Sequence, residues 1–273
     1  LLIGSCGGSG GNWNLNWVRE IVLEIAQEER LHFRLAVIES ETPRELLLKK
    51  YREGKIRALD PAPEISEAVL TEADHIVAMM GAEAYVAALE GGADVVLAGR
   101  STDAAIFAAI PVARGFPPGL CWHAAKIMEG GAAVVTMEKP EGMICTITDE
   151  HFTLEPVSPV QQCSPLSVAA HALYETADPY RMLEPGGEMD LTGARYEAVD
   201  ERVVRVSGSA FNPMPYTVKL EGASRIGYRA MVLGGVRDPV ILEQFDSWFD
   251  GLKDHIAENV EAVYGPSIRG QYQ

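Results

Sequence analysis

A short apolar segment runs directly into a cluster of glycines at the start of the sequence: Gly4-Ser5-Cys6-Gly7-Gly8-Ser9-Gly10-Gly11. Residues 1–5 are apolar and predict a strand, and apolar residues at helical spacing predict a helix over 16–29. Glycine permits positive φ and lets the backbone approach other groups closely. The chain must therefore fold so that a tight turn carries it from a strand into a helix.

The first half of the chain repeats this strand-to-helix pattern. We expect further strands over 33–39 and 93–98, and helices over 43–54, 65–89, 104–113 and 120–128, with a break near Gly81 left open in the second of these helices. Repetition of this kind, with glycines where the strands end, indicates an α/β fold with a layered, largely parallel sheet. We predict a Rossmann-like domain over 1–138, with its ligand beyond the carboxyl ends of the strands.

The second half has a different pattern. Paired strands are expected over 143–148 and 151–157, a helix over 164–176, strand-like stretches over 196–206 and 216–220, and a last helix over 238–264. This mixture predicts a smaller mixed α+β domain over 143–273. The charged, proline-containing segment Glu138-Lys139-Pro140-Glu141-Gly142 is the expected linker.

Charge and composition exclude several classes of protein. The net charge of −16 over 273 residues argues against a nucleic-acid partner and against binding to anionic membranes. No apolar run is long enough to span a bilayer, and no signal peptide is visible. We expect a true N-terminus upstream of Leu1. Four widely spaced cysteines predict reduced thiols in the cytoplasm.

The first glycine turn is a candidate anion site. Clustered N–H groups at the start of a helix hold phosphate or carboxylate, so we assign Gly7, Gly8, Ser9, Gly10 and Gly11 to substrate binding. No Gly-Lys-Ser/Thr follows, and the dinucleotide fingerprint fails at Trp13. We therefore expect no redox cofactor. A mobile connecting loop is the alternative interpretation.

Cys6 stands beside this turn. Surrounding N–H dipoles stabilise a thiolate, which makes Cys6 a candidate nucleophile. A small cysteine at the edge of the core is the alternative.

The second motif is Gly92-Ala93-Asp94-Val95-Val96-Leu97-Ala98-Gly99-Arg100-Ser101-Thr102-Asp103. Here a strand delivers Arg100 onto the turn before a helix, where its guanidinium can bind a carboxylate or phosphate. Ser101 is assigned to substrate binding with it. Asp103 is a candidate catalytic base, a helix cap, or the partner that holds Arg100 in place. A capped turn with an internal ion pair is the alternative.

Two further candidates lie outside these turns. His123, at the start of a predicted helix, is suited to proton transfer, although a packed or surface histidine fits equally. Lys219 shares one strand face with Thr217 and Glu221, which either closes over the site or is a solvated edge. The six histidines form no H-x-x-x-H pair, so we expect no metal.

Several stretches resemble the acyclic terpene utilisation (AtuA-type) family: 4–11, 92–100 with Asp103, 122–125, 165–171 with 173–175, and 216–223. The resemblance implies a catabolic role in the breakdown of branched isoprenoid acids through acyl-CoA intermediates. It supplies no catalytic residue set.

The leading hypothesis is an enzyme that acts on a carboxylate or acyl-CoA by acid–base hydratase, lyase or hydrolase chemistry. In this hypothesis the glycine turn and Arg100 bind the substrate's anionic group, and Asp103 or His123 moves the proton. Burial would have to raise the pKa of an aspartate for it to serve at neutral pH. The alternative is a non-catalytic subunit that binds acyl-CoA or carboxylate within a larger complex. We expect a homo-oligomer in either case.

Overall fold

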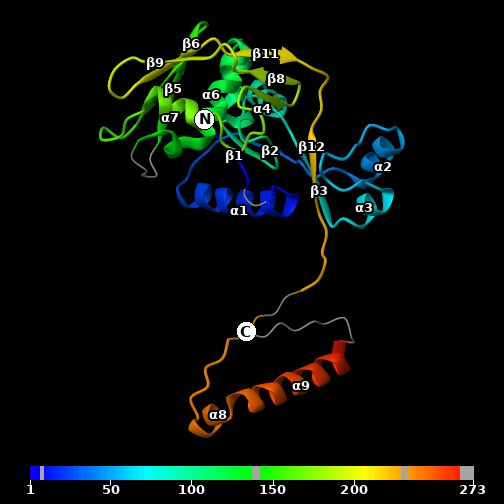
Figure 1. Ribbon diagram of the computed structural model, residues 1–273. Coiled ribbons are helices and arrows are strands. Elements are labelled where there is room, and N and C mark those ends of the chain that lie inside the picture. The colour runs from blue at the N-terminus through cyan, green and yellow to red at the C-terminus, as the bar shows by residue number, and fades with distance from the viewer. Residues whose placement is uncertain (7–8, 137–141, 229–230, 232, 265–273) are drawn as a thin grey trace. The chain divides into compact units, whose positions relative to one another are not determined.

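The computed structural model describes residues 1–6, 9–136, 142–228, 231 and 233–264 (Figure 1). The chain divides into two compact units, Leu1–Arg225 and Ile226–Gln273. Among the helices of these described ranges, none combines the length and apolarity that crossing a bilayer requires.

A parallel sheet forms the first part of the larger unit. Strands β1 (Leu2–Ser5), β4 (Val95–Ala98) and β2 (Leu35–Ile38) lie in the order β1-β4-β2, and both outer strands run parallel to β4. Leu2 and Leu35 both lie opposite Val95, so the three strands begin and end together. The parallel strands predicted for the N-terminal half are confirmed, and their layered arrangement stays a prediction.

The helices follow these strands as the sequence predicts, with one correction. Where a helical stretch is predicted over 65–89, with a break near Gly81 left open, the structure has α3 (Glu67–Glu72), strand β3 (His75–Met79) and α4 (Glu83–Glu90). The prediction was wrong there because β3 pairs with β12 (Lys219–Ala223), with Met79 opposite Lys219. A pairing partner that far along the chain leaves no local signal, and it overrides helix propensity.

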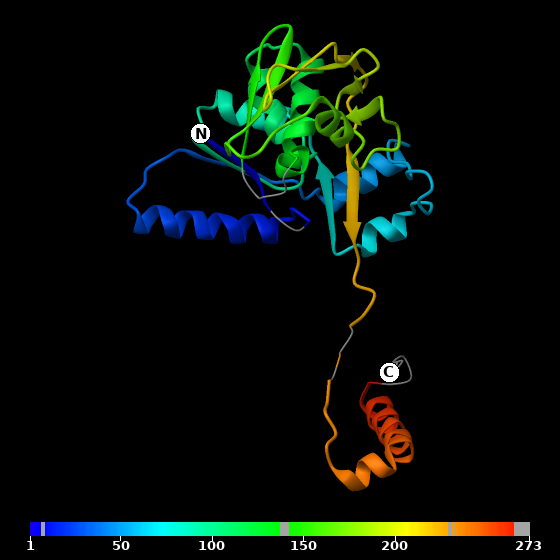
Figure 2. The same cartoon turned by 60° about the vertical axis from the view of Figure 1, so that its left-hand side comes forward.

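The remaining helices of the larger unit are α1 (Asn12–Glu28), α2 (Arg44–Arg52), α5 (Ala105–Ala113), α6 (Pro118–Gly130), the 3₁₀ turn η1 (Gly131–Val134) and α7 (Pro165–His171). In both views α1 extends alongside the sheet of β1, β2 and β4 (Figures 1 and 2).

Antiparallel sheets make up the second half of this unit. One contains β5 (Met143–Ile147), β6 (His151–Pro156), β10 (Val204–Ser207) and β9 (Arg195–Ala198), and the other β11 (Ala210–Pro213), β8 (Gly187–Asp190) and β7 (Arg181–Glu184). The predicted linker at 138–142 falls mainly on residues outside the described ranges. The division into domains 1–138 and 143–273 therefore stays a prediction.

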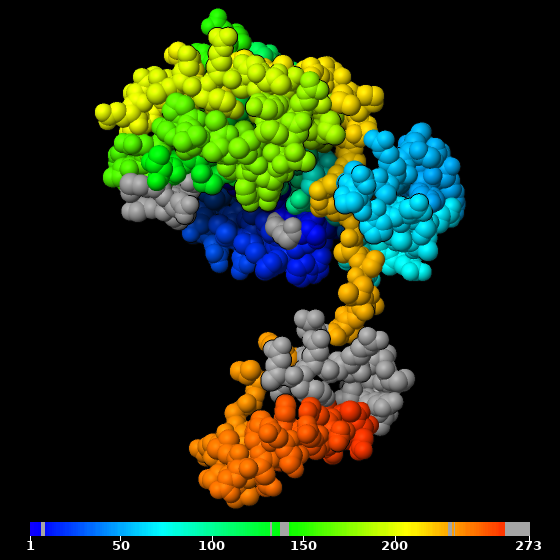
Figure 3. Space-filling model, viewed as in Figure 1, coloured from blue at the N-terminus to red at the C-terminus, as the bar shows by residue number. Residues whose placement is uncertain are grey.

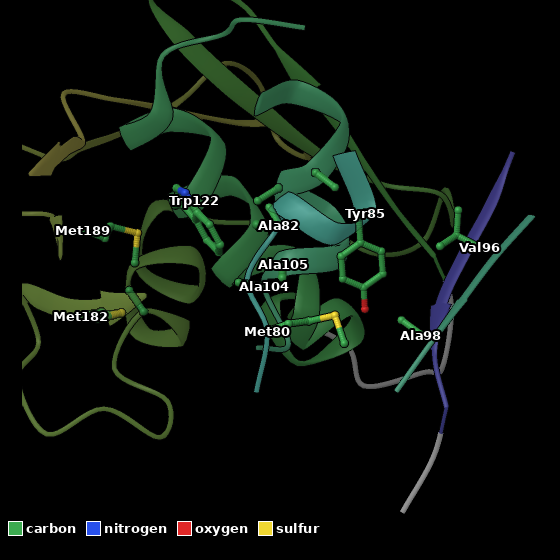
Figure 4. Close-up of a cluster of buried hydrophobic side chains, with 14 of the residues drawn as sticks. Met80, Ala82, Tyr85, Val96, Ala98, Ala104, Ala105, Trp122, Met182 and Met189 are labelled. Atoms are coloured by element: carbon green, nitrogen blue, oxygen red, sulfur yellow. The ribbon is translucent and has the colours of Figure 1, made fainter. Parts of the chain in front are cut away.

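Helix α6 joins the two halves of the core. All its residues from Gly119 to Ile127 are buried, against both the helices of the first half and the strands of the second. Trp122 stacks on Phe211 with ring centroids 6.0 Å apart. Figure 4 shows Trp122 in a cluster that also holds Met189 and the fully buried Tyr85. Such burial is worth several kcal/mol per large side chain.

The smaller unit contains α8 (Pro239–Glu243) and α9 (Phe245–Tyr264). Asp238 caps α8, because its Oδ1 accepts a hydrogen bond from the N–H of Val240 at 2.9 Å.

Two glycines are needed where the turns after β1 and β4 touch. Gly10 has φ +68°, and a Cβ built on it would lie 2.5 Å from the Arg100 nitrogen. A Cβ on Gly99 would lie 2.6 Å from the Gly10 carbonyl oxygen. These distances are too short for any side chain, so the glycines are explained by contact between the turns themselves.

We predict that Gly10→Ala destabilises the protein more than Gly54→Ala does. Gly54 has the same φ of +68° but open space around it, so its substitution isolates the backbone strain. That strain costs about 1 kcal/mol, and the clash at Gly10 raises the loss to about 2–4 kcal/mol. Urea unfolding of both variants measures the difference, and equal losses would contradict the contact.

Candidate functional site

The turns that leave β1, β2 and β4 meet at one serine. Ser40 Oγ donates a hydrogen bond to the Gly10 carbonyl at 2.9 Å and accepts one from the Arg100 N–H at 2.7 Å. Ser40 is 4% exposed. Because the three strands are parallel and in register, their carboxyl ends share one edge, and Ser40 fixes the turns there.

A carboxylate of the protein itself occupies the start of α1. Glu41 Oε2 accepts the Asn12 N–H at 3.0 Å, and Oε1 pairs with His75 Nδ1. Burial alone would raise the pKa of Glu41, but the bonds from His75 and Asn12 outweigh it and lower that pKa. Helix N-termini favour negative charge, and here Glu41 provides it.

The predicted anion loop, residues 7–11, lies directly before the helix start that Glu41 occupies. Gly7 and Gly8 lie outside the described residues, Ser9 is exposed, and Gly10 and Gly11 are buried. Substrate binding by this loop stays a prediction. A hollow of about 160 Å³ lies beside Glu41, and its other lining residues are Thr42, Arg44, Leu47, Ala73, Asp74 and Ile76.

Arg100 and Lys219 come together on one carboxylate. Arg100 Nε lies 3.0 Å from Glu221 Oε2, and Lys219 Nζ lies 2.8 Å from Glu221 Oε1. The three side chains are between a quarter and a half exposed. β12 carries Lys219 and Glu221, and Figure 3 shows its yellow-orange segment beside the cyan residues of α3. Two cations on one anion leave a net positive charge for a ligand.

Cys6 lies in the core beside the first turn. It packs with Leu15 and Leu97 and is 4% exposed. Burial raises the pKa of the thiol, which disfavours the thiolate that a nucleophile requires.

His123 is fully buried on α6. Its Nδ1 lies 2.6 Å from Ser209 Oγ and its Nε2 lies 3.2 Å from Tyr196 OH, while its ring packs edge-on against Phe152. Burial lowers the pKa of His123 to about 3. These partners belong to the second half of the unit, and the structure does not bring His123 onto the turn of Arg100.

Ser101 is buried and hydrogen-bonded inside the protein. Its Oγ lies 2.8 Å from Tyr85 OH, and burial raises the pKa of that phenol to about 12. The turn is also fixed by the end of β3, because the Met80 N–H donates to the Arg100 carbonyl and the Thr102 N–H donates to the Met80 carbonyl.

Asp103 lies within electrostatic range of a group of titratable residues that the sequence did not predict. Glu184, Glu129 and Tyr174 all have pKa values that the charge of Asp103 raises further. Asp103 itself is exposed on the turn before α5.

Lys126 and Glu129 form a buried ion pair on α6. Lys126 is 9% exposed, and its Nζ lies 2.5 Å from Glu129 Oε1. Burial raises the pKa of Glu129 although Lys126 opposes the shift. The sequence contains one feature that could have predicted this ion pair. Lys126 stands alone in the apolar stretch 120–128, and a charge on an otherwise apolar helix must find a partner.

Glu184, at the end of β7, faces the Thr102 side chain. Its Oε2 and Thr102 Oγ1 are both buried, and neither completes a well-aligned hydrogen bond with a described residue. Burial raises the pKa of Glu184 to about 7, against the opposing effects of Thr102 and Lys126. The turn after β7 is held close to β3, because a Cβ on Gly81 would lie 2.8 Å from Pro185.

His171 packs against Gly130 and Tyr174, next to the Lys126–Glu129 pair. Its ring lies so close to Gly130 that a Cβ there would be 1.9 Å from Nε2, and it stacks on Tyr174. Lys126 Nζ lies 5.9 Å from the centre of the Tyr174 ring. We read His171 as a packing residue that helps keep Lys126 out of water. Nowhere in the described ranges do three His, Cys, Asp or Glu side chains converge as metal ligands.

The low pKa of His123 predicts a loss of stability in acid. Below the unfolded value of 6.5 the unfolded chain binds a proton that the folded chain excludes down to about pH 3. The group's contribution to the free energy of unfolding should therefore be about 2 kcal/mol lower at pH 5 than at pH 7. Glu184 shifts the pH dependence of stability in the opposite direction, because its raised pKa makes the folded chain hold a proton more tightly than the unfolded chain. The effect of His123 must therefore be measured by comparing variants.

Urea unfolding of His123→Gln at both pH values should show that this component of the pH dependence is gone. The exposed His32→Gln is the matched control and should keep the behaviour of the wild type. An unchanged pH dependence in His123→Gln would contradict the buried, neutral imidazole.

Comparison with known proteins yields one match. The chain matches the family described as acyclic terpene utilisation family protein AtuA over residues 8–116 and 152–265. No curated protein and no solved structure gives a significant match. The matched ranges contain Arg100, Asp103, Glu184 and Lys219, and α6 lies between them. They cover most of the chain and suggest a role in acyclic terpene utilisation. The chain belongs to the acyclic terpene utilisation family, AtuA.

Proposed function

We propose that this protein is an enzyme that moves a proton on a carboxylate or acyl-CoA substrate of the branched, isoprenoid type. Hydratase and lyase reactions move a proton on the substrate carbon, whereas in a hydrolase reaction the same base takes the proton from the attacking water. The observation that carries the proposal is the Glu184 carboxyl, whose Oε2 is buried without a well-aligned hydrogen-bond partner among the described residues, beside Thr102 and the Lys126–Glu129 pair.

Glu184 is the proposed acid–base group. A general base works best when its pKa lies near the working pH, and burial raises that of Glu184 to about 7. Glu184 therefore takes over the role that the sequence assigned to Asp103 or His123, and Asp103 contributes a negative charge that helps keep the pKa of Glu184 high.

Lys126 and Thr102 are the proposed stabilisers of developing negative charge. Removal of a proton next to a thioester carbonyl leaves charge on the carbonyl oxygen, and buried donors stabilise that charge strongly. Lys126 is nine-tenths buried and the Thr102 hydroxyl is unpaired among the described residues.

Arg100 and Lys219 are the proposed binding groups for the substrate's carboxylate or the phosphates of CoA. Arg100 belongs to the same turn as Thr102, so binding and proton transfer involve neighbouring residues. The Arg100 guanidinium has donors beyond the Nε that faces Glu221.

The proposed chemistry needs proton transfer alone, so it requires neither a redox cofactor nor a metal. We place the protein in the cytoplasm. The four cysteines are free, as thiols in a reducing compartment are.

A non-catalytic subunit that binds acyl-CoA or carboxylate is the second candidate. It is favoured by the pairing of each cation with a carboxylate, Lys126 with Glu129 and Arg100 with Glu221, because such pairs also serve structure alone. In that case ligand binds but no proton is exchanged.

We predict that the protein exchanges the α-protons of 3-methylbutanoyl-CoA with D₂O, as followed by proton NMR. Exchange requires a base, so its rate should rise with pH through about 7, the pKa of Glu184. Glu184→Gln should slow exchange by about 100-fold or more.

The control for this experiment is Glu188→Gln on β8 of the same hairpin, whose Oε1 accepts a long bond from Asn212 Nδ2 at 3.4 Å. It should exchange like the wild type. Exchange that survives in Glu184→Gln would reject Glu184 as the base. Binding of the thioester with neither proton exchange nor hydrolysis in the wild type would favour the second candidate.

We further predict that Arg100→Ala weakens binding of this thioester and of 3-methylbut-2-enoate by roughly 10- to 100-fold, since a charge-assisted contact is worth about 1.5–3 kcal/mol. Thermal shift over a ligand series measures the loss. Arg34→Ala is the control, because Arg34 is 71% exposed and pairs with Asp94. Equal affinity in Arg100→Ala and Arg34→Ala would exclude Arg100 from the binding site.

A further inference from the structure

Helix α1 has an apolar stripe on its exposed side. Trp13, Trp17, Ile21 and Ile25 recur every fourth residue and are 70%, 55%, 39% and 48% exposed. Residues four apart lie on one side of a helix, so these side chains form a continuous strip, which we call the α1 stripe. The two tryptophan rings touch, with centroids 5.6 Å apart.

The α1 stripe lies on a different side of the helix from the residues that α1 buries. Leu15 is 1% exposed and packs with Val18 and Val22 against β4. The α1 stripe leaves roughly 300–400 Å² of apolar side chain in water, which is the size of the largest apolar patch on a typical monomer, and such a patch often has a function.

We infer that the α1 stripe is the centre of a dimer interface in which α1 packs antiparallel against α1 of a second copy of this chain. With the two-fold axis at the level of residue 19, Trp13 meets Ile25 of the second copy and Trp17 meets its Ile21. Each large ring then packs against a smaller side chain, as close packing requires. A parallel pair would instead place tryptophan on tryptophan.

The charges along α1 favour the same orientation. Glu20, Glu24 and Glu28 run along the C-terminal half beside the stripe, whereas the N-terminal half carries Asn12, Asn14 and Asn16 and no acid in its first turn. Antiparallel pairing brings the glutamates of one copy beside the uncharged asparagines of the other. In a parallel pair the two rows of glutamates would repel each other.

The exposed area of the α1 stripe indicates how strongly the two copies should bind each other. A standard interface buries about 800 Å² per partner, so the α1 stripe provides somewhat less than half of one. The dimer should therefore dissociate in the micromolar range, and it is independent of the catalytic proposal.

Sedimentation velocity of the full chain from about 1 to 200 µM tests this inference. The mass should rise from 29.6 kDa towards twice that value as concentration increases. Trp17→Glu, which places a charge in the centre of the stripe, should stay monomeric throughout. Leu23→Glu is the matched control, since Leu23 is 44% exposed on the same helix but lies off the stripe, and it should dimerise like the wild type. Circular dichroism establishes that both variants fold.

A wild type that is monomeric at every concentration would overturn the inference. So would a dimer that survives Trp17→Glu, or one that Leu23→Glu also abolishes. The orientation has its own test: a mixture of Trp13→Cys and Ile25→Cys proteins should form a disulfide-linked dimer under mild oxidation. Preferential linkage of Ile25→Cys to itself would show a parallel pair and overturn the antiparallel arrangement.

Discussion

The Ser40 hydroxyl holds together the turns that leave the carboxyl ends of β1, β2 and β4. It bonds the Gly10 carbonyl on one side and the Arg100 N–H on the other, in a place where both neighbouring turns need glycine to come so close. A buried hydroxyl with both of its bonds made is rigid, and loss of either partner would leave an unpaired polar group in the core. The position of Arg100 depends on this junction.

From that junction the two parts of the proposed site follow. The turn after β4 carries Arg100 towards Glu221 and Thr102 towards Glu184, and the end of β3 fixes both residues through the Met80 backbone. The proposed acid–base group, Glu184, comes from β7 in the second half of the unit, and Lys126 comes from the buried helix α6, which joins the two halves. Burial is what separates these groups from ordinary surface charges, because it raises the pKa of Glu184 and forces Lys126 to pair with Glu129.

The sequence predicts the local parts of this account and misses the distant ones. Parallel strands with glycine turns, and Arg100 on one of those turns, are visible because periodicity and glycine act over a few residues. Strand β3 was missed because its partner β12 is remote, and Glu184 because no spacing in the chain indicates that it will be buried against Thr102. The glycine turn as an anion site stays a prediction, and the sequence did not indicate that the N–H of Asn12 at the start of α1 binds the carboxylate of Glu41. Contact with the turn of Arg100 explains why a glycine is needed at position 10.

The most direct test of the central claim is the titration of Glu184 itself. Protein labelled with ¹³C at the glutamate side-chain carboxyls gives one NMR signal per group, and the spectrum of Glu184→Gln assigns the signal of Glu184 by its absence. The account predicts that this signal titrates with a pKa of about 7, well above the ordinary value of 4.5. A signal that titrates near 4.5 would mean that Glu184 is a solvated carboxylate, and it would contradict the proposal that this residue is the acid–base group.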